Sequence, residues 1–179
     1  MRRHINSPKK IYHYLLNIIQ DNKQVVLFLL IFIFTLTLFF TIFILFEDSF
    51  DFLKEWTADM TAITAHFFGL DATAQATLLL LDNNITFEII QECTGLFAIM
   101  IYVACVLAYP TQLVKKGEGL LLGIPLIFLL NLLRMVFLVY IGNHHYDLFE
   151  YVHSYLWQGT FIIVIILLWF IWIEKIAKT

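Results

Sequence analysis

Three chemically capable side chains lie far apart in the sequence, each at or inside a long apolar stretch. Cys93 precedes one stretch, Arg134 lies within the next, and His153 precedes the last. Cysteine attacks as a thiolate, histidine exchanges protons near neutral pH, and arginine carries a lasting positive charge. Together they would supply a nucleophile, an acid–base group and a stabilising cation, provided that the fold brings them to one place.

Cys93 stands in the sequence Glu92-Cys93-Thr94-Gly95, which predicts the start of a helix. Thr94 suits the N-cap of that helix, and Gly95 lets backbone or substrate approach closely. A helix N-terminus and a nearby cation both lower the pKa of a thiol, so this position favours a reactive cysteine. The alternative is a buried cysteine with a structural role.

Arg134 is the most costly of the three, because a charge inside a membrane span is unfavourable and by default indicates function. Asn131 lies one helical turn earlier on the same face and could hold the guanidinium in place. The alternative is an arginine that extends to the membrane surface or pairs with a structural acid. His153 has the alternative of a plain polar residue at the membrane surface. His144 and His145 share its loop, so the sequence leaves the choice of acid–base group open.

The composition explains where these residues must lie. The chain is 61% hydrophobic and 14% charged, whereas soluble domains are about a quarter charged. Four apolar runs have a length near the 17–25 residues that cross a bilayer as a helix. We therefore expect an all-α integral membrane protein, a single membrane domain over residues 1–179. The first run is too long for a signal-peptide core and predicts a retained anchor. The predicted spans are residues 25–46, 94–110, 120–141 and 155–173.

The charges predict the orientation, because cytoplasmic loops are rich in lysine and arginine. Residues 47–92 contain only one basic residue, Lys54, against nine acids, and residues 142–154 contain none. We therefore expect both termini in the cytoplasm, with Cys93 and His153 at the outer side. Arg134 would lie seven residues below the outer end of its span, roughly 10 Å deep. The expected inner residues are Arg2, Arg3, Lys9, Lys10, Lys23, Lys115, Lys116, Lys175 and Lys178.

The outer segment 47–92 has two predicted elements. Residues 49–68 have apolar positions at helical spacing, which predicts an amphipathic helix lying on the outer leaflet or packed on the spans. Residues 76–81 and 85–90 flank Asp82-Asn83-Asn84 and predict a small hairpin leading to Cys93. Its exposed edge could receive an extended peptide, although a spacer or lid fits as well. A short helix on the inner surface is expected at residues 8–20.

Other uses of these residues are less well supported. Cys93, His144, His145 and His153 could in principle hold zinc, but the chain has neither Cys-x-x-Cys nor His-x-x-x-His spacing. Cys105 follows Cys93 by twelve residues on one predicted helix, so the two cannot form a disulfide, and Cys105 suits a buried apolar position. No glycine-rich phosphate loop or basic nucleic-acid-binding face is present. We expect no metal, no organic cofactor and no nucleic-acid partner.

Three landmarks in this chain resemble the exosortase/archaeosortase family. The resemblance covers residues 85–172, about half of the chain, and the landmarks come in order at their expected membrane positions. They are Glu92-Cys93-Thr94-Gly95 opening a helix that ends in Ala108-Tyr109-Pro110, then Asn131-Leu132-Leu133-Arg134, then His153 followed by Trp157-Gln158.

The resemblance implies a membrane-embedded cysteine peptidase or transpeptidase. Such enzymes cut C-terminal sorting tails, which consist of a short motif, a transmembrane helix and basic residues, at the outer face of the cytoplasmic membrane. The implied partners are membrane-anchored proteins with these tails, and the lipid bilayer. The family's proposed catalytic residues fall on Cys93, Arg134 and His153. The neighbouring residues Asn131, Thr94, Gly95 and Glu92 would support them.

Archaeal members tend to carry a second arginine at the position of His153, so a bacterial exosortase of the cytoplasmic membrane is the closer match. The chain is shorter than a typical exosortase, with four expected spans, and resembles the compact branch such as exosortase H. Two functions from other classes stay open. A non-catalytic scaffold of envelope polysaccharide assembly would tolerate Cys93→Ser, and a membrane acyltransferase using His153 would survive the loss of Cys93.

Overall fold

The computed structural model describes residues 22–81, 85–153 and 157–178. The expected helix at residues 8–20 and the turn at residues 82–84 therefore lie outside the described residues. The helices are α2 (Lys23–Leu45), α3 (Asp51–Phe67), α4 (Leu96–Ala108), α5 (Leu113–His144), α6 (Tyr146–Tyr151) and α7 (Trp157–Trp172). Short helical turns are η1 (Glu47–Phe50), η2 (Gln91–Cys93) and η4 (Ile173–Ala177), and the strands are β1 (Ala72–Gln75), β2 (Leu78–Leu81) and β3 (Thr86–Glu88).

The described chain is a mostly helical membrane protein with three helices long and apolar enough to cross a bilayer. These are Lys23–Leu45, Leu113–His144 and Gly159–Ala177. The second predicted span is a helix, but α4 has only 13 residues. At 1.5 Å per residue it is about 20 Å long, shorter than a hydrocarbon core of about 30 Å. The fourth complete crossing thus remains a prediction.

The predicted inner loop at residues 111–119 is largely helical. α5 begins at Leu113 and includes Lys115 and Lys116, and it continues to His144 at the other end. The apolar run at residues 120–141 could not predict where α5 begins and ends, because a helix can continue through charged residues that face a polar surrounding. As a result, the connection from α4 to α5 is short.

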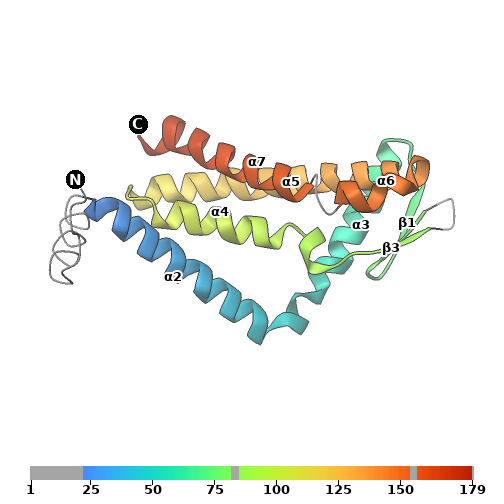
Figure 1. Cartoon of the computed structure of the whole chain (residues 1–179), viewed down its shortest axis with the longest axis horizontal. Helices are drawn as coiled ribbons and strands as arrows, with labels where there is room; N and C mark the ends of the chain where they lie inside the picture. The colour runs from blue at the N-terminus through green and yellow to red at the C-terminus, as the bar shows by residue number, and fades with distance from the viewer. Residues whose placement is uncertain (1–21, 82–84, 154–156, 179) are drawn as a thin grey trace, which may run out of the picture.

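The long helices lie side by side, and a cap covers one end of them. We call α3, the three strands and α6 the cap (Figure 1). The beginning of α2 and the end of α7 lie at the opposite end of the molecule (Figure 1). This arrangement fits the prediction of both termini on one side of the membrane, and the side itself remains a prediction.

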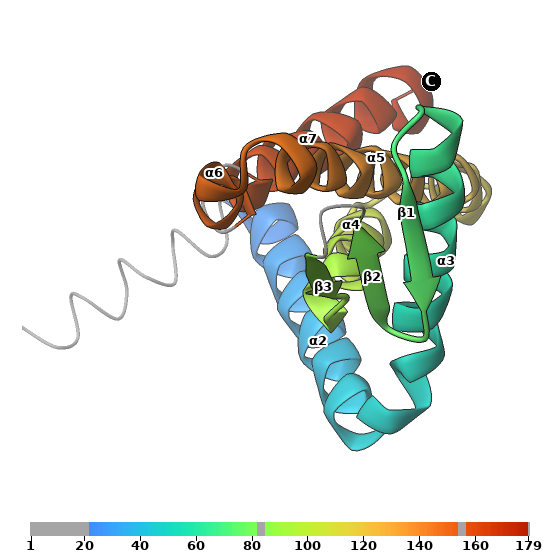
Figure 2. The same cartoon turned by 90° about the vertical axis from the view of Figure 1, so that its right-hand side faces the viewer.

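The cap contains an antiparallel sheet in the order β1-β2-β3, which faces the viewer in Figure 2. β2 pairs with β3, with Leu80 opposite Thr86, so the predicted hairpin is confirmed with shorter strands. β1 was not predicted, because its sequence Ala-Thr-Ala-Gln lacks the alternation of large apolar side chains that indicates a strand. Leu79 and Leu81 of β2 are buried against α3 and α5, which attaches the sheet to the helices.

The amphipathic helix predicted at residues 49–68 is confirmed as α3, but a different face is buried. Its buried residues are small or polar, namely Thr57, Ala58, Thr61 and Ala65. Small residues let helix backbones approach closely, so this face packs in the protein. The large apolar residues of the predicted stripe, such as Ile63 and Phe67, are exposed and available to an apolar surrounding.

Candidate active site

The chain turns sharply at Cys93 between the sheet and α4. Thr94 Oγ1 donates a hydrogen bond to the Gln91 carbonyl at 2.7 Å and accepts one from the Leu96 backbone N–H at 3.2 Å. The helix N-cap is Gly95 and not Thr94 as expected, since α4 begins at Leu96. Thr94 therefore still accepts a hydrogen bond from a backbone N–H at the start of the helix, although it lies one residue before the cap position.

Gly95 and Asn131 lock this turn onto α5. Gly95 has φ +77°, a left-handed conformation that favours glycine, and a methyl group there would come within 3.1 Å of the Asn131 side chain. Asn131 is fully buried, and its Nδ2 donates to the Cys93 carbonyl at 2.7 Å. The position of Cys93 is thus set by a residue 38 positions later in the sequence.

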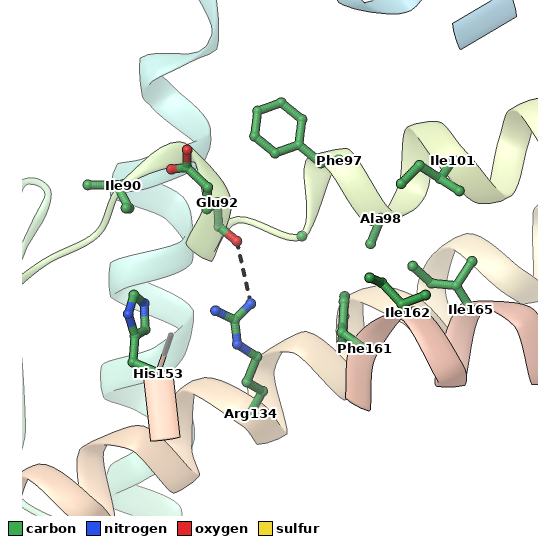
Figure 3. Close-up of a pocket in the computed structure, with 11 residues that line it drawn as sticks. Ile90, Glu92, Phe97, Ala98, Ile101, Arg134, His153, Phe161, Ile162 and Ile165 are labelled. Carbon is green, nitrogen blue, oxygen red and sulfur yellow. Dashed lines mark hydrogen bonds between the residues drawn. The ribbon is translucent and has the colours of Figure 1, made fainter. Parts of the chain in front are cut away.

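Arg134 reaches from α5 toward the same turn. Its Nη1 lies 3.4 Å from the Glu92 carbonyl and 3.3 Å from Asn131 Oδ1, to which it donates. Glu92 takes part through its backbone, as the dashed line in Figure 3 shows, while its side chain is exposed. Among the described residues no carboxylate forms an ion pair with Arg134. The guanidinium charge is therefore held by neutral oxygens, which leaves it able to stabilise another anion.

Arg134 lies deeper below its helix end than the sequence predicted. α5 ends at His144, ten residues beyond Arg134, which corresponds to about 15 Å along the helix. The ring of Phe161 on α7 lies beside the guanidinium, with its centroid 5.8 Å from Cζ. Aromatic faces attract cations, so α7 contributes to holding the charge.

His153 is the histidine that the fold brings to Cys93. The distance from Cys93 Sγ to His153 Nε2 is 3.7 Å, and the imidazole stacks on Phe149 at 5.8 Å with an interplanar angle of 4°. His144 instead lies 3.1 Å from the Tyr140 carbonyl and is exposed. Within the described residues no group of three His, Cys, Asp or Glu side chains is placed to hold a metal ion.

Burial sets the protonation of the Cys93–His153 pair. Burial raises the pKa of the Cys93 thiol, and the nearby Arg134 opposes this only partly. Burial also lowers the pKa of His153, and the charge of Arg134 lowers it further. The sequence left the protonation of Cys93 open, because it did not show that the side chain is only 3% exposed and that burial outweighs the factors favouring a thiolate. Both groups are neutral at neutral pH.

Two pockets adjoin this pair and share Ile90 and His153 in their lining. The larger, about 450 Å³, contains Arg134 and extends between α4 and α7. In Figure 3 Arg134 and His153 both project toward the loop that carries Ile90 and Glu92. The smaller, about 210 Å³, contains Cys93 and lies under the cap, between β3, α5 and α6. An extended chain crossing the pair would enter both pockets.

The sequence did not indicate three neighbours of the site. Phe149 precedes His153 by four residues, a spacing that could have suggested a shared helical face. Phe161 gave no such signal, since its contact with Arg134 joins two different helices. Gln91 is buried, and its side-chain amide has no hydrogen-bond partner among the described residues.

Comparisons with known proteins identify the family of this chain. The family model described as transmembrane exosortase (Exosortase_EpsH) matches residues 23–172. A segment of 68 residues is 31% identical to archaeosortase A of Haloferax volcanii; it covers 37% of this chain and 22% of that protein. The match thus spans less than a quarter of the length of that relative. No solved structure matches at a significant level. Since the family model covers most of the chain, from α2 to the end of α7, the protein belongs to the transmembrane exosortase family.

Proposed function

We propose that this protein is a cysteine peptidase or transpeptidase that cleaves C-terminal sorting tails at the outer face of a bacterial cytoplasmic membrane. The observation that carries the proposal is the 3.7 Å contact between Cys93 Sγ and His153 Nε2, beside a buried arginine without an acidic partner among the described residues. A nucleophile within reach of a base, with a cation close by, is the arrangement that covalent acyl transfer needs. Membership of the exosortase family supports the same reaction.

The first step forms a thioester. His153 Nε2 takes the proton of the neutral Cys93 thiol while Sγ attacks the carbonyl carbon of the scissile peptide bond. The carbonyl oxygen becomes an oxyanion, which the guanidinium of Arg134 stabilises. The protonated His153 then gives its proton to the leaving amine nitrogen, and the C–N bond breaks.

The second step releases the acyl group. An acceptor amine or a water molecule attacks the thioester carbonyl and loses a proton to His153. The C–S bond breaks, and the thiolate of Cys93 recovers that proton. Because the pair starts and ends neutral, neither Cys93 nor His153 has to keep a buried charge between turnovers.

The environment explains why the nucleophile lies between the cap and the long helices. A sorting tail carries its motif directly before a transmembrane helix, so the scissile bond lies close to the membrane surface. Cys93 lies between the last strand of the cap and α4. In the proposed orientation this position is close to the outer membrane surface, where the scissile bond would arrive. The proposed substrates are therefore membrane-anchored proteins, and soluble peptides without a helix would be poor substrates.

The test uses a tailed host protein as a reporter and measures its processing in cells. Cys93→Ala and His153→Ala should each leave the uncleaved precursor, while His144→Ala should process normally because His144 lies against Tyr140 on its own helix. Each variant is compared at equal membrane abundance. Normal processing by Cys93→Ala would refute the peptidase and favour a scaffold. Loss of processing in His153→Ala but not in Cys93→Ala would favour a histidine-dependent acyltransferase.

A further inference from the structure

A long apolar groove runs away from the Arg134 pocket along α4. The middle pocket, about 380 Å³, shares Ile101, Ile162 and Ile165 with the Arg134 pocket. The last pocket, about 280 Å³, shares Phe28 and Trp169 with the middle one. The three pockets therefore adjoin one another along α4, and we call them together the α2–α7 groove.

The groove has α4 as its floor and α2 and α7 as its walls. α2 and α7 lie on opposite sides of α4 and diverge toward the cap (Figures 1 and 2). At the far end they meet through the rings of Phe28 and Trp169, whose centroids are 5.6 Å apart. The groove is thus narrow at the end away from the cap and widens toward the reactive residues.

The chemistry of the lining indicates the occupant. The middle pocket is lined by aliphatic and aromatic side chains with Cys105, and it contains no charged residue. Charged side chains line the groove only at the cap end, where Glu92 and Arg134 lie together with the neutral His153. A molecule that fits must be apolar along most of its length and present a polar, reactive group at the cap end.

The direction follows from the second pocket beside Cys93. That pocket lies against the cap and is lined by β3, Phe149 and buried residues such as Leu79 and Val139, whereas the Arg134 pocket extends along α4 and α7. A chain whose carbonyl lies at Cys93 and which continues along the membrane-crossing helices therefore leaves through the Arg134 pocket. The floor α4 is about 20 Å long, enough for about two thirds of a helix that crosses a hydrocarbon core of about 30 Å.

We propose that the α2–α7 groove holds the transmembrane helix of the substrate, with the residues before the scissile bond in the pocket under the cap. This assignment rests on the proposed peptidase function. The tail helix would pack against α4 and complete a bundle with α2 and α7. α2 suits this role because only 6% of its most apolar stretch is buried within the described chain.

Photo-crosslinking tests the groove directly. The photoreactive residue p-benzoylphenylalanine replaces Leu29 or Ile166, which line the groove and are 47% and 46% exposed. Leu30 and Leu167 are matched controls on the same helices; they are 62% and 54% exposed and do not line it. The full chain carries Cys93→Ala to retain uncleaved precursor, and the probe is the tailed reporter in host membranes.

The expected result is an adduct of enzyme and reporter from both groove positions, at least tenfold stronger than from the controls. Equal adducts at all four positions, or adducts only from the controls, would overturn the groove assignment. Adducts with lipid alone at the groove positions would overturn it as well, and would identify the groove as an acyl-chain site.

The outcomes separate the groove from the reaction. Processing by the wild-type chain without groove adducts would leave the peptidase intact and remove the groove. Groove adducts without any processing by the wild-type chain would support the groove and refute the peptidase. In the wild-type background, Leu29→Trp or Ile166→Trp should lower processing at least tenfold by filling the groove, whereas Leu30→Trp should not.

Discussion

At the scale of single residues, burial decides the chemistry of Cys93 more than its neighbours do. A helix start and an arginine would favour a thiolate, yet the folded site raises the pKa of the thiol and lowers that of His153. A neutral pair avoids the cost of two buried charges at rest. In the proposed reaction, Arg134 acts on charge that develops in the transition state, which is where a fixed cation contributes most.

This protonation state predicts a pH dependence. Alkylation of Cys93 by uncharged iodoacetamide should be slow at pH 7 and still rise above pH 9, because a raised thiol pKa delays formation of the thiolate. Processing needs neutral His153, whose pKa is lowered, so activity should persist down to pH 6.5 and fall only below it. Arg134→Gln should raise both pKa values, since the positive charge lowers both, and should slow processing about 100- to 1,000-fold, as loss of one oxyanion donor does.

Peptide-resolved mass spectrometry of the detergent-solubilised chain distinguishes Cys93 from Cys105. An alkylation rate that already reaches a plateau near pH 6 would contradict the neutral pair and indicate a thiolate–imidazolium pair. If the alkylation of Cys93 in Arg134→Gln rose at a lower pH than in the wild type, this would contradict the role of the guanidinium charge.

At the scale of elements, the turn before α4 depends on one glycine and one asparagine. Gly95→Ala must adopt a positive φ at a cost of about 1–3 kcal/mol, and its methyl group would also push Asn131 away from the Cys93 carbonyl. Gly69 is a matched control, because it has φ +74° and no atom lies within 4 Å of the place that an alanine methyl group would occupy. Both substitutions should lower the unfolding temperature, and only Gly95→Ala should also impair processing.

Thermal unfolding and reporter processing, measured on the same membranes, check this prediction. Equal processing by Gly95→Ala and Gly69→Ala would show that Asn131 does not position Cys93. Normal unfolding of both variants would contradict the backbone strain at these glycines.

The elements also show how far the sequence could predict the fold and the site. Helix periods and apolar runs located α2, α3, α5 and α7, because burial in lipid or protein imposes those patterns. They could not reveal β1 or the ends of α4 and α5, which depend on contacts with distant residues. The predicted common side of the membrane placed Cys93 near the histidines of the last outer loop but did not select His153 among them. The contact with His153 and the burial of the pair arise only when the cap packs on α5.

At the scale of the whole molecule, the distribution of charge predicts the orientation that the reaction needs. Lys115, Lys116 and Lys175 belong to the ends of α5 and η4 opposite the cap, whereas the cap segment is acidic. Since positive loops stay in the cytoplasm, the cap and Cys93 should face outward, where tailed proteins arrive after export.

Cysteine accessibility tests this orientation. In a chain with Cys93→Ala and Cys105→Ala, Thr73→Cys on exposed β1 should react with a membrane-impermeant maleimide in intact cells or spheroplasts. Gly117→Cys, exposed near the beginning of α5, should react only after the membrane is opened. The reverse pattern would place the reactive pair in the cytoplasm and contradict cleavage of exported tails. Reaction of both positions in intact cells would show that α5 does not separate the two compartments, which would refute its assignment as a membrane span.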